Sequence, residues 1–429
     1  MISLELFKTL IIEGQEDIAQ AEVNPREIEL EQNGKYVFVG IRQAGKSYLL
    51  YQQAKQLIAN GMALEDMLYI NFDDERLLEL AAENLDMILQ AYTTLYVDRQ
   101  PVLFLDEIQN IKGWEHFARR VANQKYRTYI TGSNAKMLSR DIQTTLGGRY
   151  LDVSVYPYSF REWLAAQDIH LSTNWQYSKQ RLLVANKLDD YLRWGGFPEL
   201  LMFNGKRAWL NNLYEKILLG DIIQRNGIKN EQALRLVIKR LAENVRQPVA
   251  YNRLANLIKS TGISTNTTSI IQYMDFVKDA CLLFTIDNYA SKFVEKVTTK
   301  KHYFVDNGLL SIFLTGGETA LLENMCAIHL YQQYGEKLYY YRNRIEVDFY
   351  VPDESIVVQV CHTLSANSNA DETFRRETEA IVKFNHQYPC KQNLIITREE
   401  EQHLLIDGVG IEVVPVWKWL LLPHTDYAK

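Results

Sequence analysis

The chain has 429 residues, which at roughly 100 to 200 residues per domain predicts two to four domains and excludes a single small binding module. Hydrophobic residues make up 47% and charged residues 23%, so several cores can be buried, and a disordered or low-complexity chain is excluded. The 47 Lys and Arg residues against 53 Asp and Glu give a formal net charge of −6, which excludes a uniformly basic nucleic-acid coat. Any contact with nucleic acid must come from a local basic face.

Four widely spaced cysteines form no C-x-x-C pair, which is typical of free thiols in a reducing compartment. The opening residues, MISLELFKTLIIEGQEDI, carry glutamates where a signal peptide has a basic flank, and no stretch approaches about 20 uncharged residues. We therefore expect a cytoplasmic protein without a membrane segment. The eight histidines show neither an i, i+4 pair nor an acidic partner at ligand spacing, so no zinc site is predicted.

An amphipathic helix is expected from Leu4 to about Ala21, and short apolar runs then alternate with helical stretches. Five of these runs are typical of buried parallel strands because they are apolar and rich in β-branched or aromatic residues. They are KYVFVG from Lys35, LYINFDD from Leu68, PVLFLDE from Pro101, RTYITGSN from Arg127 and the run from Tyr150 to Tyr156. The alternation predicts an α/β fold whose parallel sheet is joined by right-handed crossovers.

The rest of the chain divides into three further segments. Residues 159–229 follow a helical pattern with a turn at Trp194-Gly195-Gly196-Phe197-Pro198, which predicts a helical lid or linker. In residues 230–295, three amphipathic stretches precede the apolar run LLFTIDNYA, an order typical of a winged helix-turn-helix whose wing is that run. In residues 296–429, strands and helices alternate again and predict a small mixed α/β domain.

The segment from Gly40 to Ser47, GIRQAGKS, fits G-x-x-x-x-G-K-[ST] between a predicted strand and a predicted helix. A random chain of this length would match about one time in a hundred, so a plain glycine turn is the weaker interpretation. Glycines let successive backbone N–H groups close around a phosphate, and the N-terminus of the following helix adds positive potential. Lys46 would neutralise the β- and γ-phosphates, and the Ser47 hydroxyl would bind Mg²⁺. Nucleotide contacts are expected from Gly40, Arg42, Gln43, Ala44, Gly45, Lys46, Ser47 and Tyr48.

Two acids end the apolar run that starts at Pro101, in the arrangement known as a Walker B strand. Asp106 would hold Mg²⁺ through water, and Glu107 would polarise the attacking water as general base. Merely solvated strand-end acids are the weaker alternative after a phosphate loop at this spacing. If Glu107 is not the base, Asp73 and Asp74 at the end of the adjacent strand are the next candidates.

Two polar residues further along would complete the site. Asn134 follows the next strand and would orient the attacking water or sense the γ-phosphate. Arg149, in Gly147-Gly148-Arg149, would supply positive charge for phosphoryl transfer in its own subunit or to a neighbouring one. A structural salt bridge is an equally good interpretation of Arg149. The sequence thus predicts ATP and Mg²⁺ as ligands and leaves the oligomeric state open.

With these motifs in place, the chain resembles prokaryotic ATPases of the AAA-type superfamily whose C-terminal half is a domain of unknown function. The resemblance covers nearly the whole chain, and its most specific stretches are SFREWL, GGFPE and the region from DNGLL to EVDF. It implies a P-loop AAA-type ATPase core with an N-terminal helix over 1–158, a helical lid over 159–229, a winged helix over 230–295 and a PD-(D/E)xK nuclease-like fold over 296–429. Such proteins look like a nucleotide switch joined to these C-terminal parts.

The nuclease-like fold that the resemblance implies holds Mg²⁺ with two carboxylates on adjacent strands, and a lysine stabilises the developing negative charge. Asp348 matches the first acid, but Gln359 and Cys361 stand where the motif asks for an acid and a lysine. Glu323 on the preceding helix could still ligate a metal, and Lys383 could replace the lysine from another direction. Because glutamine is a poor Mg²⁺ ligand and cysteine carries no fixed positive charge, we expect a degenerate site without nuclease activity.

Three functions compete. The first is an ATP-hydrolysing switch that positions the winged helix and the C-terminal domain against a partner. The second is a DNA-binding regulator or nuclease effector with a structural nucleotide, and the third is a pseudo-enzyme scaffold. The intact phosphate loop and Walker B acids favour the first. The expected recognition segment from Ser264 to Tyr273 contains no Arg or Lys, which favours packing between domains over DNA contact, with a protein partner or DNA both left open.

Overall fold

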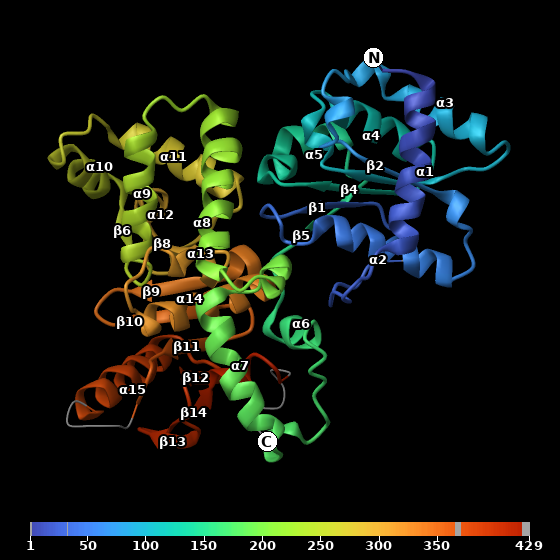
Figure 1. Cartoon of the computed structure of the whole chain (residues 1–429). Helices are drawn as coiled ribbons and strands as arrows, with labels where there is room; N and C mark the ends of the chain where they lie inside the picture. Colours follow the sequence, from blue (N-terminus) through green and yellow to red (C-terminus); the bar gives the residue numbers. More distant parts are fainter. Residues whose placement is uncertain (1, 32, 365–369, 423–429) are drawn as a thin grey trace. The chain divides into compact units, whose positions relative to one another are not determined.

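The computed structural model describes residues 2–31, 33–364 and 370–422 (Figure 1). The chain divides into two compact units: unit 1 comprises residues 1–157 with 279–281, and unit 2 comprises residues 158–278 with 282–429. Among the described residues, no helix has the length and apolar character needed to span a bilayer. The predicted division of the chain after residue 158 into three segments stays a prediction.

Unit 1 contains a five-stranded sheet in the order β2-β3-β4-β1-β5, and all its neighbouring strands are parallel. The strands are β1 (Tyr36–Val39), β2 (Met67–Asn71), β3 (Val102–Asp106), β4 (Thr128–Gly132) and β5 (Leu151–Ser154). The helices are α1 (Leu4–Gln20), α2 (Lys46–Ala59), α3 (Asp86–Leu95), α4 (Trp114–Asn123) and α5 (Arg140–Leu146). This confirms the predicted α/β fold with an N-terminal parallel sheet, and it brings the carboxyl ends of β1, β3 and β4 to one edge, where such sheets bind ligands.

Helices and loops cover both faces of β1 to β4, which explains their continuous apolar runs, whereas the edge strand β5 is largely exposed. On one face, Val37 of β1 joins a core cluster with Phe7 of α1. On the other face, the rings of Phe38, Phe104 and Tyr129 stack across neighbouring strands. Unit 1 therefore provides a rigid base for the loops that follow β1, β3 and β4.

Unit 2 contains a mixed nine-stranded sheet in the order β13-β14-β12-β11-β10-β9-β7-β8-β6. The strands are β6 (Val249–Ala250), β7 (Leu283–Asn288), β8 (Thr299–Phe304), β9 (Tyr339–Arg342), β10 (Glu346–Val351), β11 (Ile356–Val360), β12 (Gln392–Thr397), β13 (Gln402–Ile406) and β14 (Val409–Pro415). The helices from residue 160 onward are α6 (Phe160–Ala165), α7 (Gln180–Trp194), α8 (Lys206–Lys216), α9 (Glu231–Glu243), α10 (Tyr251–Ser260), α11 (Thr267–Asp279), α12 (Phe293–Thr298), α13 (Asn307–Ser311), α14 (Glu318–Tyr334), α15 (Ala370–Gln387) and α16 (Val416–Trp419). A π-helical segment, Ile217–Gln224, continues α8.

The strand expected as the wing of a winged helix belongs to this same sheet. β7 pairs antiparallel with β8, and its last residues Asp287 and Asn288 pair parallel with Tyr339 and Tyr340 of β9. Hydrogen bonds therefore run without interruption from the strands beside α9, α10 and α11 into the C-terminal strands. Residues on both sides of the expected boundary at 295 share one sheet, which the local sequence pattern did not indicate.

Two motifs of the resemblance meet inside unit 2. Asp306, the first residue of DNGLL, is 3% exposed, and its carboxylate accepts hydrogen bonds from the backbone N–H groups of Gly196 and Gly308, each at 2.7 Å. Gly195 has φ 75°, and a Cβ at this position would lie 2.0 Å from the Asp306 carboxylate. GGFPE and DNGLL thus form one contact that requires glycine, which fixes the end of α7 against the start of α13.

Candidate functional site

The phosphate loop connects β1 to α2 at the carboxyl edge of the unit 1 sheet. Gly40 lies so close to the backbone segment that follows β5 that a Cβ at this position would lie 1.9 Å from the carbonyl oxygen of Val155. Gln43 and Gly45 both have positive φ, 62° and 92°, which turns successive N–H groups of the loop toward one side. Because α2 begins at Lys46, the free N–H groups of its first turn are available at the same place.

Lys46 is the central cation of this edge. Its side chain is 4% exposed, and Nζ donates to the carbonyl oxygens of Gly40 and Ile41, both at 3.2 Å. Nζ also lies 3.3 Å from Oε1 of Glu107. The structure therefore brings the predicted phosphate-binding lysine and the predicted general base into one ion pair.

Asp106, at the end of β3, is fully buried and surrounded by hydroxyl donors. Tyr69 of β2 donates to Oδ2 at 2.7 Å, Thr131 of β4 donates to Oδ1, and Ser47 also forms a hydrogen bond with the carboxylate. Burial, followed by the negative charge of Glu107, raises the pKa of Asp106, while the hydroxyl groups oppose this rise. A carboxylate held beside the Ser47 hydroxyl is the oxygen ligand set that Mg²⁺ accepts.

Glu107 has left-handed backbone angles, φ 53° and ψ 38°, a conformation that few non-glycine residues adopt. Its backbone N–H donates to Thr131 Oγ1 at 2.9 Å, and its Oε2 accepts a hydrogen bond from Gln109. Burial alone would raise the pKa of Glu107, but the Lys46 ammonium and the hydrogen bonds from Gln109 and Ser133 outweigh burial and lower it. Glu107 is therefore ionised at neutral pH.

The other predicted residues of unit 1 stand apart from this ion pair. Asn134 is 8% exposed, and its Oδ1 accepts the N–H of Lys136 at 2.8 Å, which caps the short turn after β4. Arg149 donates to the carbonyl oxygens of Leu146 and Gly147 and forms no ion pair with any described residue, so its predicted salt-bridge role finds no acidic partner there. Tyr48 is 54% exposed, with its ring edge-on to Tyr51.

The loop residues Arg42 and Gln43 are half-buried, and Ala44 is fully buried. The alternative base Asp74 is already engaged, because Arg76 lies 2.7 Å away and its hydrogen bond lowers the pKa of Asp74. Asp73 accepts a hydrogen bond from Asn110. Neither acid contacts Lys46.

Three contact residues of this site were missed from the sequence. Tyr69 and Gln109 bind the two acids, and Arg26 binds the phosphate loop itself. Arg26 is 9% exposed and donates to the carbonyl oxygens of Ala44 at 3.0 Å and Tyr156 at 2.7 Å. The sequence alone did not mark Arg26, because its segment has no regular structure and only the fold shows that this arginine is buried.

In unit 2, Lys301 of β8 provides a buried cation beside the residues of the predicted nuclease-like motif. Lys301 is fully buried, and Nζ lies 3.3 Å from Asp348, 3.4 Å from Glu323 and 3.5 Å from Glu346. Lys383 is exposed on α15 and pairs with Glu379 at 2.6 Å. Lys383 lines the same cavity as Asp348 and Gln359, so its suggested role stays a prediction, while Lys301 supplies a buried positive charge from another strand.

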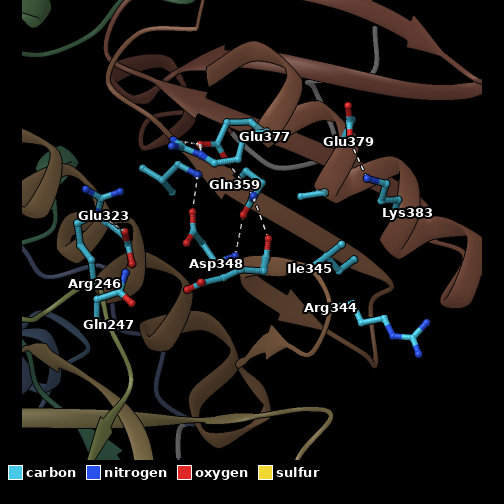
Figure 2. Close-up of a pocket in the computed structure, with 14 residues that line it drawn as sticks. Arg246, Gln247, Glu323, Arg344, Ile345, Asp348, Gln359, Glu377, Glu379 and Lys383 are labelled. Carbon is cyan, nitrogen blue, oxygen red and sulfur yellow. Dashed lines mark hydrogen bonds and ion pairs between the residues drawn. The ribbon is translucent and has the colours of Figure 1, made fainter. Parts of the chain in front are cut away.

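Gln359 of β11 connects the backbone of Asp348 with the carboxylate of Glu377 (Figure 2). Its Oε1 accepts the backbone N–H of Asp348 at 2.7 Å, and its Nε2 donates to Oε2 of Glu377 at 2.9 Å. Burial, followed by the charge of Asp348, raises the pKa of Glu377 to about 7. Cys361 is 4% exposed and belongs to a hydrophobic cluster, and burial raises its pKa to about 12, so it takes no part in the charged cluster. Within the described residues, no three His, Cys, Asp or Glu side chains are arranged to hold a metal ion.

A family model described as an AAA domain matches residues 32–164, and one described as a domain of unknown function matches residues 185–320. The chain is 29% identical over 435 residues to an uncharacterised protein of Methanocaldococcus jannaschii, covering 97% of this chain and 95% of that protein. It is 32% identical over 397 residues to an uncharacterised protein of Haemophilus influenzae, covering 90% of this chain and 94% of that protein.

Solved structures with a partial likeness include the Orc1 protein of Aeropyrum pernix in complex with DNA, at a TM-score of 0.29 and 13% identity, covering 77% of this chain and 94% of that one. Another is AMPPCP-bound DnaA from Aquifex aeolicus, at a TM-score of 0.26 and 14% identity, covering 65% of this chain and 89% of that one. TM-scores this low support no inference about the function of this chain.

Proposed function

We propose that this chain, which carries an AAA domain and belongs to the same family as the uncharacterised protein of Haemophilus influenzae, binds ATP with Mg²⁺ in unit 1 and hydrolyses it. The observation that supports this most directly is the ion pair between Lys46 and Glu107 beside Asp106 and the phosphate loop. A glycine turn with a purely structural role would not need a buried lysine and two acids at the ligand-binding edge of a parallel sheet.

ATP binding requires Lys46 to change partners. In the structure, Nζ is held by the carbonyl oxygens of Gly40 and Ile41 and by Glu107. The β- and γ-phosphate oxygens would replace these acceptors, while N–H groups of the loop and of the first turn of α2 bind the same phosphates. This exchange frees the Glu107 carboxylate from its ion pair.

The residues present fit Mg²⁺, because the Ser47 hydroxyl and the buried Asp106 carboxylate are hard oxygen groups that already contact each other. When bound, the metal would neutralise charge on the β- and γ-phosphates. Glu107, freed from Lys46 and still hydrogen-bonded to Gln109, would then accept a proton from the water that attacks the γ-phosphorus. We assign the orientation of that water to Asn134, whose Nδ2 has no partner among the described residues.

Nucleotide state would pass from the phosphate loop to the end of unit 1 through Arg26. One guanidinium binds both the loop carbonyl of Ala44 and the carbonyl of Tyr156, and unit 2 begins at Tyr158. A shift of the loop on phosphate binding would therefore move the backbone at Tyr156, two residues before unit 2 begins. Within unit 2, we assign α9, α10 and α11 with β6, β7 and β8 to a winged helix whose role is packing, and the C-terminal strands to a nuclease-like fold without nuclease activity.

Arg149 fits a role toward a neighbouring copy. It is exposed and has no acidic partner among the described residues, so its charge is available to a nucleotide held by another subunit. A ring or other oligomer is part of this proposal.

Calorimetric titration of the full chain with Mg²⁺·ATP tests the binding site. Lys46→Ala should abolish measurable binding, because it removes the cation that the phosphates need. Lys55→Ala is the matched control: it removes a lysine from the same helix, and Lys55 donates only to the carbonyl oxygen of Ala19, away from the loop. Equal affinities of Lys46→Ala and wild type would place the nucleotide elsewhere.

A further inference from the structure

A cavity of about 440 Å³ opens in unit 2 beside β10, β11, α14 and α15. Its walls carry acidic and basic side chains, several of which Figure 2 shows around Asp348 and Gln359, and their exposure divides them into a buried inner layer and an exposed outer layer. We propose that this cavity binds a phosphate group of an anionic ligand through the arginines at its mouth, without a metal ion. This inference is independent of the function proposed for unit 1.

The inner layer is acidic, and its charge is balanced by Lys301 together with Arg246 and Arg376 of the outer layer. Glu323 is 1%, Glu377 6% and Asp348 16% exposed, and the fully buried ammonium of Lys301 lies against Glu323 and Asp348. Burial alone would lower the pKa of Lys301, but the surrounding carboxylates outweigh burial and raise it, so Lys301 stays charged. Breaking a buried pair leaves a charge uncompensated, which is strongly unfavourable. The protein's own lysine therefore occupies the position among these carboxylates that a bound cation would need.

The outer layer, which a ligand meets first, is basic. The side chains of Arg246, Arg376 and Lys383 are 42%, 62% and 58% exposed. Arg344 is also exposed and extends at the margin of the cavity (Figure 2). Three of these cations pair with acids that line the cavity: Arg246 with Glu323, Arg376 with Glu377 and Lys383 with Glu379. The half-buried Glu346, at 34%, also lines it. The most accessible groups of the wall are therefore mainly cationic, and Arg344 is the one without an acidic partner among the described residues.

Unused N–H groups point to phosphate as the anion. Arg246 donates to Glu323 through Nε, and its two terminal nitrogens have no hydrogen-bond partner among the described residues. Arg376 donates to Glu377 through Nε and Nη2, which leaves Nη1. Arg344 has no partner at all within the described part of the chain, so its whole guanidinium is available. Guanidinium groups with free parallel N–H donors match phosphate oxygens in geometry and charge.

The ligand would be of the size of a mononucleotide or the terminal nucleotide of a strand, since small-molecule pockets of about 300 to 1,000 Å³ enclose such groups. Two sources share this chemistry, a free phosphate compound and the backbone of a single-stranded nucleic acid. The two can be separated in one set of binding measurements.

The experiment uses the full chain with Lys46→Ala, so that the phosphate loop does not contribute, in buffer containing EDTA. Binding of pyrophosphate is measured by calorimetry, and binding of a fluorescent single-stranded oligonucleotide by anisotropy. Arg344→Ala is the main variant, because a side chain without partners can be removed without disturbing the fold. Arg375→Ala is the control, since Arg375 is an exposed neighbour of Arg376 that does not line the cavity.

We expect Arg344→Ala to weaken binding about tenfold or more, the effect of one lost charge-assisted contact, and Arg375→Ala to leave it unchanged. Arg376→Ala should weaken binding as well. If Arg344→Ala and Arg376→Ala weaken the binding of both probes, or of pyrophosphate alone, the cavity is assigned to free phosphate compounds. If these variants weaken the binding of the oligonucleotide alone, the cavity is assigned to a nucleic-acid backbone. Absence of binding by both probes, or binding that neither Arg344→Ala nor Arg376→Ala changes, would overturn the proposal.

Discussion

The Lys46–Glu107 ion pair predicts that Glu107→Gln tightens ATP binding. Wild-type Lys46 must leave Glu107 to reach the phosphates, and the freed carboxylate then repels the γ-phosphate. The variant removes the ion pair and the repulsion, while it keeps the size of the side chain and the proposed magnesium ligand Asp106. Two electrostatic effects therefore act in the same direction.

The 3.3 Å distance between Nζ of Lys46 and Oε1 of Glu107 determines the energy of their electrostatic attraction. Coulomb's law at this distance gives about 1 kcal/mol at the dielectric constant of water and about 5 kcal/mol at an effective value of about 20. Because the ammonium exchanges one anion for another, we expect a gain near the lower end, about 1 to 2 kcal/mol, or roughly tenfold in affinity.

Calorimetry with Mg²⁺·ATP, performed before hydrolysis depletes the ligand, measures this gain. Asp73→Asn is the control, since it removes one negative charge after the adjacent strand β2 without touching Lys46. If Glu107→Gln binds ATP no more tightly than wild type, or if Asp73→Asn gives the same gain, the exchange of partners by Lys46 is refuted.

Two further predictions concern unit 2. The folded-state pKa of Glu377 is raised from 4.5 to about 7, so between these values the unfolded chain loses a proton that the folded chain keeps. Stability should therefore fall as the pH rises to 7, by at most roughly 3 kcal/mol in total. Glu377→Gln should flatten the difference in the free energy of unfolding between pH 5.5 and 8.5, whereas the exposed Glu379→Gln should not. Arg376 opposes this rise in pKa, and Arg246 faces the same carboxylate, so an unchanged pH profile in Glu377→Gln would mean that these cations dominate. We also predict no cleavage of plasmid or single-stranded DNA in Mg²⁺ or Mn²⁺, because Gln359 and Cys361 replace the acid and the lysine of the motif. Cleavage that disappears in Asp348→Ala would contradict this prediction.

The features that could be predicted from the sequence are those that depend on a local pattern of residues. Strands β1 to β4 are buried on both faces, so their apolar runs indicated strands in the sequence. The predicted phosphate loop and the two acids after β3 lie within short contiguous motifs. Parallel pairing of β3, β4 and β1 then explains why Asp106 and Glu107 reach the loop.

Contacts between segments that lie far apart in the chain could not be predicted from the sequence. Tyr69 binds Asp106 from another strand, 37 residues earlier, and no residue pattern marks that hydroxyl. Lys301 was missed because the motif places a lysine on the strand of Gln359, whereas the fold supplies one from β8, 47 residues before Asp348. Glu377 lies 18 residues after Gln359 on a helix whose facing side depends on how it packs. The place of β7 in the nine-stranded sheet likewise follows from long-range pairing rather than from its own sequence.

The central claim is that unit 1 hydrolyses ATP with Glu107 as general base. The most direct measurement is the steady-state rate of phosphate release from Mg²⁺·ATP for wild type and Glu107→Gln, at saturating nucleotide and with or without duplex DNA. Removing a positioned general base typically costs about 10² to 10⁴ in rate, so we predict measurable turnover in wild type and a loss of that order in the variant. An unchanged turnover number in Glu107→Gln, or no turnover by wild type under either condition, would contradict the account.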